Sequence, residues 1–202
     1  MESGRPDHPQ TRWADGLVQH GGMEKPMVYT IGHSTRPIDE FVAMLNAHGV
    51  TRLIDVRTIP KSRHNPQYHR DSLEAHLQDT GIGYEHMKAL GGLRRPRKDS
   101  PNAGWRNESF RGYADYMGTV EFASALDAVI EAATHERAVI MCAEAVPWRC
   151  HRSLIADSLT AQGYPVQHIM SATKANRHSL TSFAKLQGTS ITYPADVNEG
   201  VL

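Results

Sequence analysis

An alternation of short apolar strands with amphipathic helices is the feature that most constrains the fold. Residues 27–31 and 52–57 are apolar segments of strand length, and the segment between them carries apolar residues at helical spacing. A strand, a helix and a second strand in so short a space predict a βαβ unit. The strands of such a unit pair in parallel through a right-handed crossover.

The same alternation continues along the chain. Helices are predicted at 71–79, 110–117, 120–133, 152–162 and 171–187, and strands at 82–86, 138–142 and 166–170. We therefore expect an α/β fold, a single-domain sandwich whose Rossmann-like, mostly parallel sheet has about five strands and helices on both faces. Residues 27–187 are expected to form this domain, between a flexible leader at 1–26 and a flexible tail at 188–202.

Charge and cysteine content limit the function classes. Lys and Arg together number 22, as do Asp and Glu, so no global positive field favours indiscriminate binding of nucleic acid. Two cysteines are too few for a disulfide framework, and neither a signal peptide nor an apolar segment of membrane-spanning length is present. We expect a cytoplasmic protein without a membrane partner, whose two thiols are reduced apart from a transient disulfide.

Both cysteines fall in one segment, residues 139–153. Cys142 lies where a buried strand ends, and Cys150 lies where the next helix begins. Ligands of open α/β sheets bind beyond the carboxyl ends of the strands, and helix N-termini there favour anions. The segment also holds several charged or titratable residues, namely Glu144, Arg149, His151 and Arg152.

Two other strand ends carry polar groups. His33 and Ser34 follow the first strand, and Asp55 and Arg57 lie at the end of the second. Because the carboxyl ends of parallel strands lie at one edge of the sheet, these groups are expected to meet the cysteine segment in one cleft. Arg57 would bind a carboxylate or phosphate there, or would simply pair with Asp55.

These patterns give a set of candidate site residues with alternatives. Cys150 is the stronger nucleophile candidate, because a helix N-terminus and neighbouring cations lower the pKa of a thiol; Cys142 could be an inert buried thiol. The charged residues could instead form a structural ion-pair cluster. The catalytic candidates are Cys142, Glu144, Cys150 and His151, and the substrate-binding candidates are His33, Ser34, Asp55, Arg57, Arg149 and Arg152.

Several motifs occur in a recognisable order. They are Tyr29 to Ser34, Leu53 to Arg57 with Pro60 and Ser62, Leu90-Gly-Gly92, Tyr113 to Met117, and Met141 to Glu144 with Pro147 and Cys150 to Arg152. In this order they resemble the bacterial and archaeal domain of unknown function family 488, over about residues 28–170. The resemblance implies a small α/β protein with a shared polar site and leaves the reaction open.

Residues 53–57 are also similar to a segment of sulfurtransferases of the rhodanese type. Those enzymes carry the nucleophile as the first Cys of a tight Cys-x-x-x-x-Arg loop. Cys142 would be the nearest equivalent, but here the loop is longer and contains Glu144 and Pro147. This similarity is an analogy of pattern and assigns no reaction.

Three hypotheses about function follow. The first is an enzyme whose Cys/Glu/His/Arg cleft acts on a small anionic, nucleotide-like substrate or on a nucleic-acid end. The second is a metal- or haem-binding sensor in which Cys142, Glu144, Cys150 and His151 supply ligands. The third is a nucleic-acid-binding accessory protein that uses the basic segment 88–111.

Overall fold

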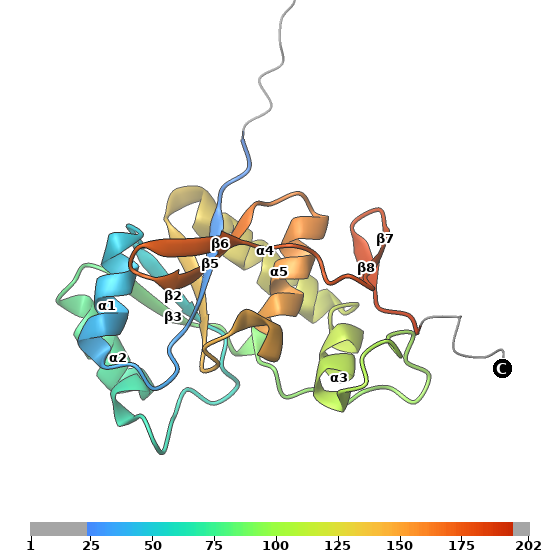
Figure 1. Cartoon of the computed structure of the whole chain (residues 1–202), viewed down its shortest axis with the longest axis horizontal. Helices are drawn as coiled ribbons and strands as arrows, with labels where there is room; N and C mark the ends of the chain where they lie inside the picture. Colours follow the sequence, from blue (N-terminus) through green and yellow to red (C-terminus); the bar gives the residue numbers. More distant parts are fainter. Residues whose placement is uncertain (1–23, 196–202) are drawn as a thin grey trace, which may run out of the picture.

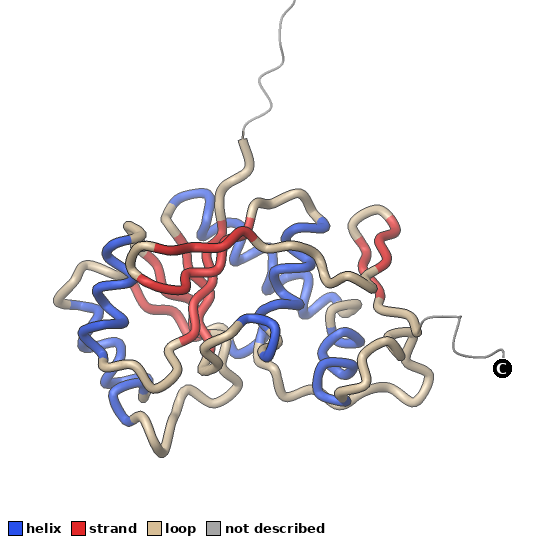
Figure 2. Tube along the Cα trace, viewed as in Figure 1, coloured by secondary structure: helices blue, strands red, loops and turns tan. Residues whose placement is uncertain are grey.

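The computed structural model describes residues 24–195, which form an α/β sandwich around a six-stranded sheet (Figure 1 and Figure 2). The order across the sheet is β3-β2-β4-β1-β5-β6, with β1 to β5 parallel and β6 antiparallel at the edge. This confirms the predicted fold class and adds one strand to the expected five. The strands are β1 (Val28–Gly32), β2 (Arg52–Asp55), β3 (Gly83–His86), β4 (Ala138–Cys142), β5 (Val166–Ser171) and β6 (Lys174–Arg177).

Helices cover both faces of the sheet, as predicted. Figure 1 views the sheet from its β6 edge, with α1 and α2 on one face and α4 and α5 on the other. No helix within residues 24–195 has the length and the apolar composition needed to cross a membrane. The α-helices are α1 (Ile38–Ala47), α2 (Arg70–Gln78), α3 (Glu108–Tyr116), α4 (Val120–His135) and α5 (Arg152–Ala161); the short 3-10 turns are η1 (Pro66–Tyr68), η2 (Lys88–Leu90) and η3 (Pro147–Arg149).

Side chains alternate between the two faces along each central strand. Leu53 of β2 and Val139 of β4 are buried in the core that contains α1 and α2. Their neighbours Ile54 and Ile140 are buried in the core on the other face, with residues of α3, α4 and α5. A strand buried on both faces reads as a continuous apolar run, which is why these segments are predictable from the sequence.

The connections place a crevice at the centre of the sheet. The helices α1 and α2 follow β1 and β2 on one face, whereas α4 and α5 lie before and after β4 on the other. The neighbouring strands β1 and β4 are therefore continued on opposite faces. Such a switch point opens a crevice beyond the carboxyl ends of the strands, where ligands of this architecture bind.

The segment 171–187, predicted to be a final helix, forms strands, and that prediction is wrong. After β5 the chain turns, and the N–H of Thr173 donates to the hydroxyl of Ser171 at 3.3 Å before β6 pairs back onto β5. Short polar side chains that bond to nearby backbone compete with helix formation. Further on, β7 (Lys185–Gln187) and β8 (Ser190–Thr192) form a separate hairpin.

The described structure also extends past residue 187, where the sequence places the start of a flexible tail. That boundary falls inside the β7–β8 hairpin, and Tyr193 beyond it is fully buried. The reason is a tertiary contact that the local sequence does not encode. Residues 1–23 of the predicted leader and 196–202 of the predicted tail lie outside the described residues.

This contact is made by the fully buried carboxylate of Asp157 in α5. It accepts hydrogen bonds from Nε2 of His178 at 2.8 Å, from the hydroxyl of Tyr193 at 2.9 Å, and from the N–H and hydroxyl of Thr181 at 3.0 and 2.6 Å. Nδ1 of His178 lies 2.9 Å from Nε2 of His168 in β5. Asp157 thus connects the C-terminal segment to both α5 and the sheet.

Replacing Asp157 with Asn is expected to lower the free energy of unfolding by about 2–4 kcal/mol, because an amide nitrogen cannot accept the bonds that both carboxylate oxygens accept. Urea denaturation followed by circular dichroism measures the change. Asp127→Asn makes the same chemical change at an exposed position of α4 and should stay within about 0.5 kcal/mol of the parent. Equal stability of the two variants would contradict the role given to Asp157.

Candidate functional site

A cavity of about 510 Å³ lies beyond the carboxyl ends of β1, β2 and β4. Its wall combines these strand ends with the segment 58–62, the turn at 92–93 and the start of α3. Three predicted site residues, Ser34, Asp55 and Arg152, are not among the residues that line this cavity. The other seven line the cavity, namely His33, Arg57, Cys142, Glu144, Arg149, Cys150 and His151.

Backbone pairing between β1 and β4 continues beyond the strands and brings His33 beside Cys142. The N–H of His33 donates to the carbonyl of Cys142 at 3.0 Å, and the N–H of Ser34 donates to the carbonyl of Ala143 at 2.8 Å. Only glycine fits at position 32, because a Cβ there would lie 1.7 Å from the carbonyl oxygen of Glu144. Gly32 therefore allows the loop after β4 to cross the end of β1.

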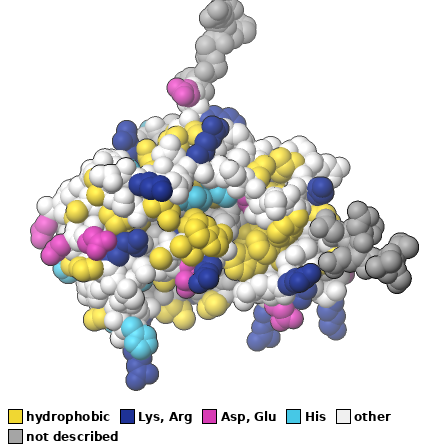
Figure 3. Space-filling view, viewed as in Figure 1, with side chains coloured by type: hydrophobic (Ala, Val, Ile, Leu, Met, Phe, Trp, Pro, Cys, Tyr) yellow, Lys and Arg dark blue, Asp and Glu magenta, His cyan; other side chains and the backbone are white. Residues whose placement is uncertain are grey.

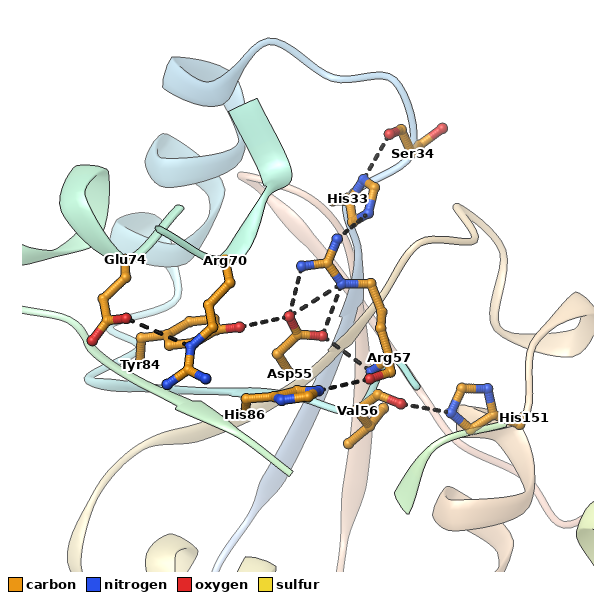
Figure 4. Close-up of polar contacts among 10 residues, drawn as sticks. All are labelled: His33, Ser34, Asp55, Val56, Arg57, Arg70, Glu74, Tyr84, His86 and His151. Atoms are coloured by element: carbon orange, nitrogen blue, oxygen red, sulfur yellow. Dashed lines mark hydrogen bonds and ion pairs between the residues drawn. The ribbon is translucent and has the colours of Figure 1, made fainter. Parts of the chain in front are cut away.

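The guanidinium of Arg57 is held between Asp55 and His33 (Figure 4). Nε and Nη2 of Arg57 donate to the Asp55 carboxylate at 2.9 and 2.6 Å, and Nη1 lies 3.3 Å from Nε2 of His33. The hydroxyl of Tyr84 donates to Asp55 at 2.8 Å, and Nε2 of His86 donates to the carbonyl of Arg57 at 2.8 Å. An arginine has five N–H donors, so some remain for a ligand in the cavity.

His33 is neutral near pH 7, and its neighbours fix the position of its proton. Nδ1 lies 2.7 Å from the carbonyl oxygen of Ser34, which only accepts, so Nδ1 carries the hydrogen and Nε2 accepts from Arg57. Burial outweighs the hydrogen bond to Ser34 and lowers the pKa of His33 from 6.5 to about 4. The ring stacks on Tyr68 with 4.0 Å between centroids. His33 is therefore an oriented, uncharged group at the cavity wall.

The two cysteines meet at the floor of the cavity. Their Sγ atoms lie 2.6 Å apart, and the residues are only 2% and 5% exposed. The intervening loop, 143–149, turns through η3 and returns Cys150 to the end of β4. The structure thus settles whether this loop closes, a point on which the sequence is silent.

The surroundings of the two thiols shift their pKa values in opposite directions. Burial raises the pKa of Cys142, but the hydrogen bond from Cys150 and the charge of Arg152 outweigh it and leave the pKa below that of a free thiol. Burial, followed by the contact with Cys142, raises the pKa of Cys150 well above that value. The helix N-terminus and nearby cations do not offset the desolvation of Cys150, so Cys142 is the residue that favours the thiolate.

His151 lies beside Cys150 as an uncharged base. Its Nε2 is 3.3 Å from the carbonyl oxygen of Val56 and therefore donates, which leaves Nδ1 as an acceptor 3.6 Å from Sγ of Cys150. Burial lowers the pKa of His151 to about 4, so the ring is neutral near pH 7. A Cβ on Gly92 would lie 2.5 Å from this Nδ1, which explains why glycine stands at the position that packs against the ring.

Arg152 is a buried cation behind the thiols. It is 1% exposed; Nη2 donates to the carbonyl of Ala145 at 2.9 Å, while Nε and Nη1 are buried without a hydrogen-bond partner in the described part of the chain. No carboxylate within residues 24–195 forms an ion pair with it. A buried, unpaired charge costs several kcal/mol, so a compensating negative charge nearby is favoured. The charge of Arg152 acts on both thiols: it lowers the pKa of Cys142 and opposes the rise in the pKa of Cys150.

The remaining predicted residues differ in their access to the cavity. Glu144 and Arg149 are exposed at its rim, where both can reach a ligand. Ser34 contributes its carbonyl oxygen to orient His33, and its φ of 52° marks the sharp turn after β1. Asp55 is fully buried and orients Arg57.

Sequence reasoning left out several residues that line the cavity. Lys61 adds an exposed cation, and Ile59, Leu93 and Phe110 add apolar surface at the mouth. Ile59 and Leu93 are 61% and 73% exposed, which is unusual for large apolar side chains. The irregular, Pro- and Gly-rich composition of the segments that carry them was the available signal, since such loops often form binding surfaces.

Two alternative hypotheses depend on a metal-ligand cluster and on free cations in the basic segment 88–111, and the structure shows these features only in part. Within residues 24–195, no group of three or more His, Cys, Asp or Glu side chains is arranged to hold a metal ion. In the basic segment, Arg97 pairs with Asp99 and Arg111 with Glu108. The guanidinium of Arg94 lies 3.5 Å above the ring of Tyr116. These three arginines are held by neighbouring residues of their own region.

A second cavity, also of about 510 Å³, lies on the other side of η3. In Figure 3, hydrophobic side chains form a band across the middle of the molecule next to histidine side chains. Pro147 and Trp148 of η3 face this second cavity, whereas the adjacent Arg149 faces the first. Neither cysteine lines this second cavity. Its wall consists of Trp105, Pro147, Trp148, Ser153, His168, Met170, Asn176, Arg177, His178, Ser179 and Thr181.

Fold and site together define a doubly wound α/β protein with two thiols in contact at the switch point of its sheet. The chain belongs to the family described as domain of unknown function DUF488, whose model matches residues 37–159. This confirms the family resemblance, and the matched region includes every predicted site residue except His33 and Ser34. No curated protein and no solved structure matches the chain significantly.

The buried histidines predict that stability falls on acidification. The pKa of His33 and of His151 is about 4 in the folded protein and 6.5 when exposed, so the unfolded chain takes up these protons first as the pH falls. For each of these two histidines, the free energy of unfolding should fall by roughly 2 kcal/mol between pH 7 and pH 5. Urea denaturation at these two pH values measures the loss. His33→Gln should reduce this loss of stability. His135→Gln, at an exposed position of α4, should leave the loss unchanged. Equal stability of the wild type at both pH values would contradict the burial of neutral histidines.

Proposed function

We propose that the protein is a thiol-dependent enzyme in which Cys142 is the nucleophile and a small anionic molecule is the substrate. One observation carries the proposal: two thiols are in contact at the floor of a cavity, beside buried Arg152, which forms no ion pair with a carboxylate of residues 24–195. The thiolate is the reactive form of cysteine, and an adjacent positive charge favours it.

The charges around the cavity support an anionic substrate. Lys61 and Arg149 are exposed at its wall, and Arg57 presents N–H groups that Asp55 and His33 do not use. Glu144 is the only carboxylate among the described residues that line the cavity. A planar guanidinium held from behind binds carboxylate or phosphate with defined geometry.

The size and the apolar mouth of the cavity support a nucleotide-like shape. A volume of about 510 Å³ lies within the usual range for small-molecule sites. Ile59, Leu93 and Phe110 would contact a flat or apolar portion of the ligand, while its anionic group lies near the cations. Burying the exposed side chains of Ile59 and Leu93 would add to the binding free energy.

The proposed chemical roles follow from the contacts. Cys142 attacks the substrate, and Cys150 donates its S–H hydrogen bond to the Cys142 thiolate. His151 is a positioning residue, because its Nδ1 lies 3.6 Å from Sγ of Cys150 and contacts that thiol as a neutral acceptor. Glu144, at the rim, exchanges a proton with the leaving group.

Alkylation with iodoacetate, an anion, and iodoacetamide, its neutral analogue, tests both parts of the proposal. Cys142 should react faster than Cys150 near pH 7, and iodoacetate should be favoured relative to its reactivity toward free cysteine. Lys61→Gln and Arg149→Gln should each reduce this preference by about fivefold, the equivalent of about 1 kcal/mol of attraction. Glu144→Gln should increase it. Peptide mapping by mass spectrometry identifies the modified residue.

Lys174→Gln is the matched control, since this exposed cation lies on β6 outside the cavity wall. It should leave the ratio of the two rates unchanged. Preferential alkylation of Cys150, or the same rate ratio in every charge variant, would contradict the proposal.

A further inference from the structure

The contact between the thiols supports a more specific chemistry than nucleophilic attack alone. A nucleophile needs one cysteine, yet Sγ of Cys150 lies 2.6 Å from Sγ of Cys142, with 5% of the residue exposed. A second thiol in this place can attack any adduct formed at Cys142 through a sulfur atom. Disulfide exchange proceeds by such attack of a thiolate on a disulfide sulfur through a mixed disulfide.

We infer that Cys142 and Cys150 form a reversible dithiol–disulfide couple that exchanges with a small anionic disulfide or its thiol, bound in the cavity beyond β1, β2 and β4. This inference rests on the proposed role of Cys142 as nucleophile. It assigns Cys150 the role of resolving cysteine and identifies sulfur as the atom attacked.

The exchange balances in two steps. The Cys142 thiolate attacks one sulfur of the ligand disulfide, which forms a mixed disulfide and releases one ligand thiolate. The ligand thiolate released in the first step then accepts the proton of Cys150, and the Cys150 thiolate attacks Sγ of Cys142. The second ligand thiolate leaves as the Cys142–Cys150 disulfide forms. The ligand disulfide is reduced by two electrons, the protein dithiol is oxidised, and excess small thiol reverses the sequence.

Access to the sulfur atoms decides between small and macromolecular disulfides. Cys142 and Cys150 are 2% and 5% exposed and line the floor of the cavity. This burial favours a small disulfide, because a disulfide on a folded protein surface would have to enter the cavity lined by Ile59 and Leu93 to reach the thiols. Lys61 and Arg149 at the wall select an anionic ligand over a cationic one.

Arg152 sets the direction in which the couple is biased. In the reduced protein, the charge of Arg152 favours the Cys142 thiolate, and this thiolate compensates the buried charge of Arg152; in the disulfide form the compensation is lost. The reduced form is thereby stabilised, and couples of this kind have disulfides that small thiols reduce readily. The disulfide form should therefore return to the dithiol in the presence of excess small thiol.

The test uses 3,3′-dithiodipropionate, a dianionic disulfide, with the dication cystamine as the charge control. Reduced wild-type protein should lose the mass of two hydrogen atoms and acquire a Cys142–Cys150 disulfide. Cys150→Ser should instead retain a mixed disulfide on Cys142, and Cys142→Ser should form no adduct at Cys150. The anionic reagent should react about tenfold faster than cystamine, or more.

A mixed disulfide that persists on Cys142 of the wild type would overturn the inference and leave the nucleophile assignment intact. If iodoacetate alkylates Cys142 but neither disulfide reagent forms an adduct, the assignment of a disulfide as substrate fails and Cys142 remains the nucleophile. If Cys142 reacts with neither reagent, the proposed function fails as well. The wild-type mass change needs no variant, so the test stands even if a serine variant does not fold.

Discussion

The pairing of β1 with β4 is the constraint on which the site depends. It continues past the strands through the N–H groups of His33 and Ser34, and it requires glycine at position 32 because the carbonyl of Glu144 occupies the space of a side chain. The same crossing brings the loop 143–149 back over the sheet, so that Cys150 returns to Cys142. One backbone contact therefore positions a histidine and both thiols.

A balance of buried charge links this geometry to chemistry. Asp55 compensates Arg57, and the resulting pair orients His33 without giving the cavity a strong net charge. Arg152 has no such carboxylate among the described residues, and its charge instead favours the thiolate form of the nearby cysteines. Burial makes the neutral forms of His33 and His151 the stable ones. The Cys142 thiolate is therefore the anion favoured at the floor of the site, beside two uncharged imidazoles. This asymmetry distinguishes the two cysteines.

Much of the fold follows from the sequence, because buried parallel strands read as continuous apolar runs and helices as periodic ones. The convergence of His33, Arg57 and Cys142 also follows, since parallel strands end at one edge. The pKa order of the thiols does not, because it depends on how deeply Cys150 is buried. The strands after β5 were missed for a similar reason: Asp157 in α5 determines where this segment lies, and no local pattern identifies its distant partners.

The most direct test of the account is the thiolate titration of the wild type and of Arg152→Met, followed by ultraviolet absorbance. Methionine replaces the buried cation with an uncharged side chain of comparable length. The account predicts one thiolate of lowered pKa in the wild type and an increase of about one to three pKa units in the variant. Arg149→Gln, which removes an exposed cation, should change the titration little. Two thiols that titrate as free cysteines in the wild type, unchanged by Arg152→Met, would contradict it.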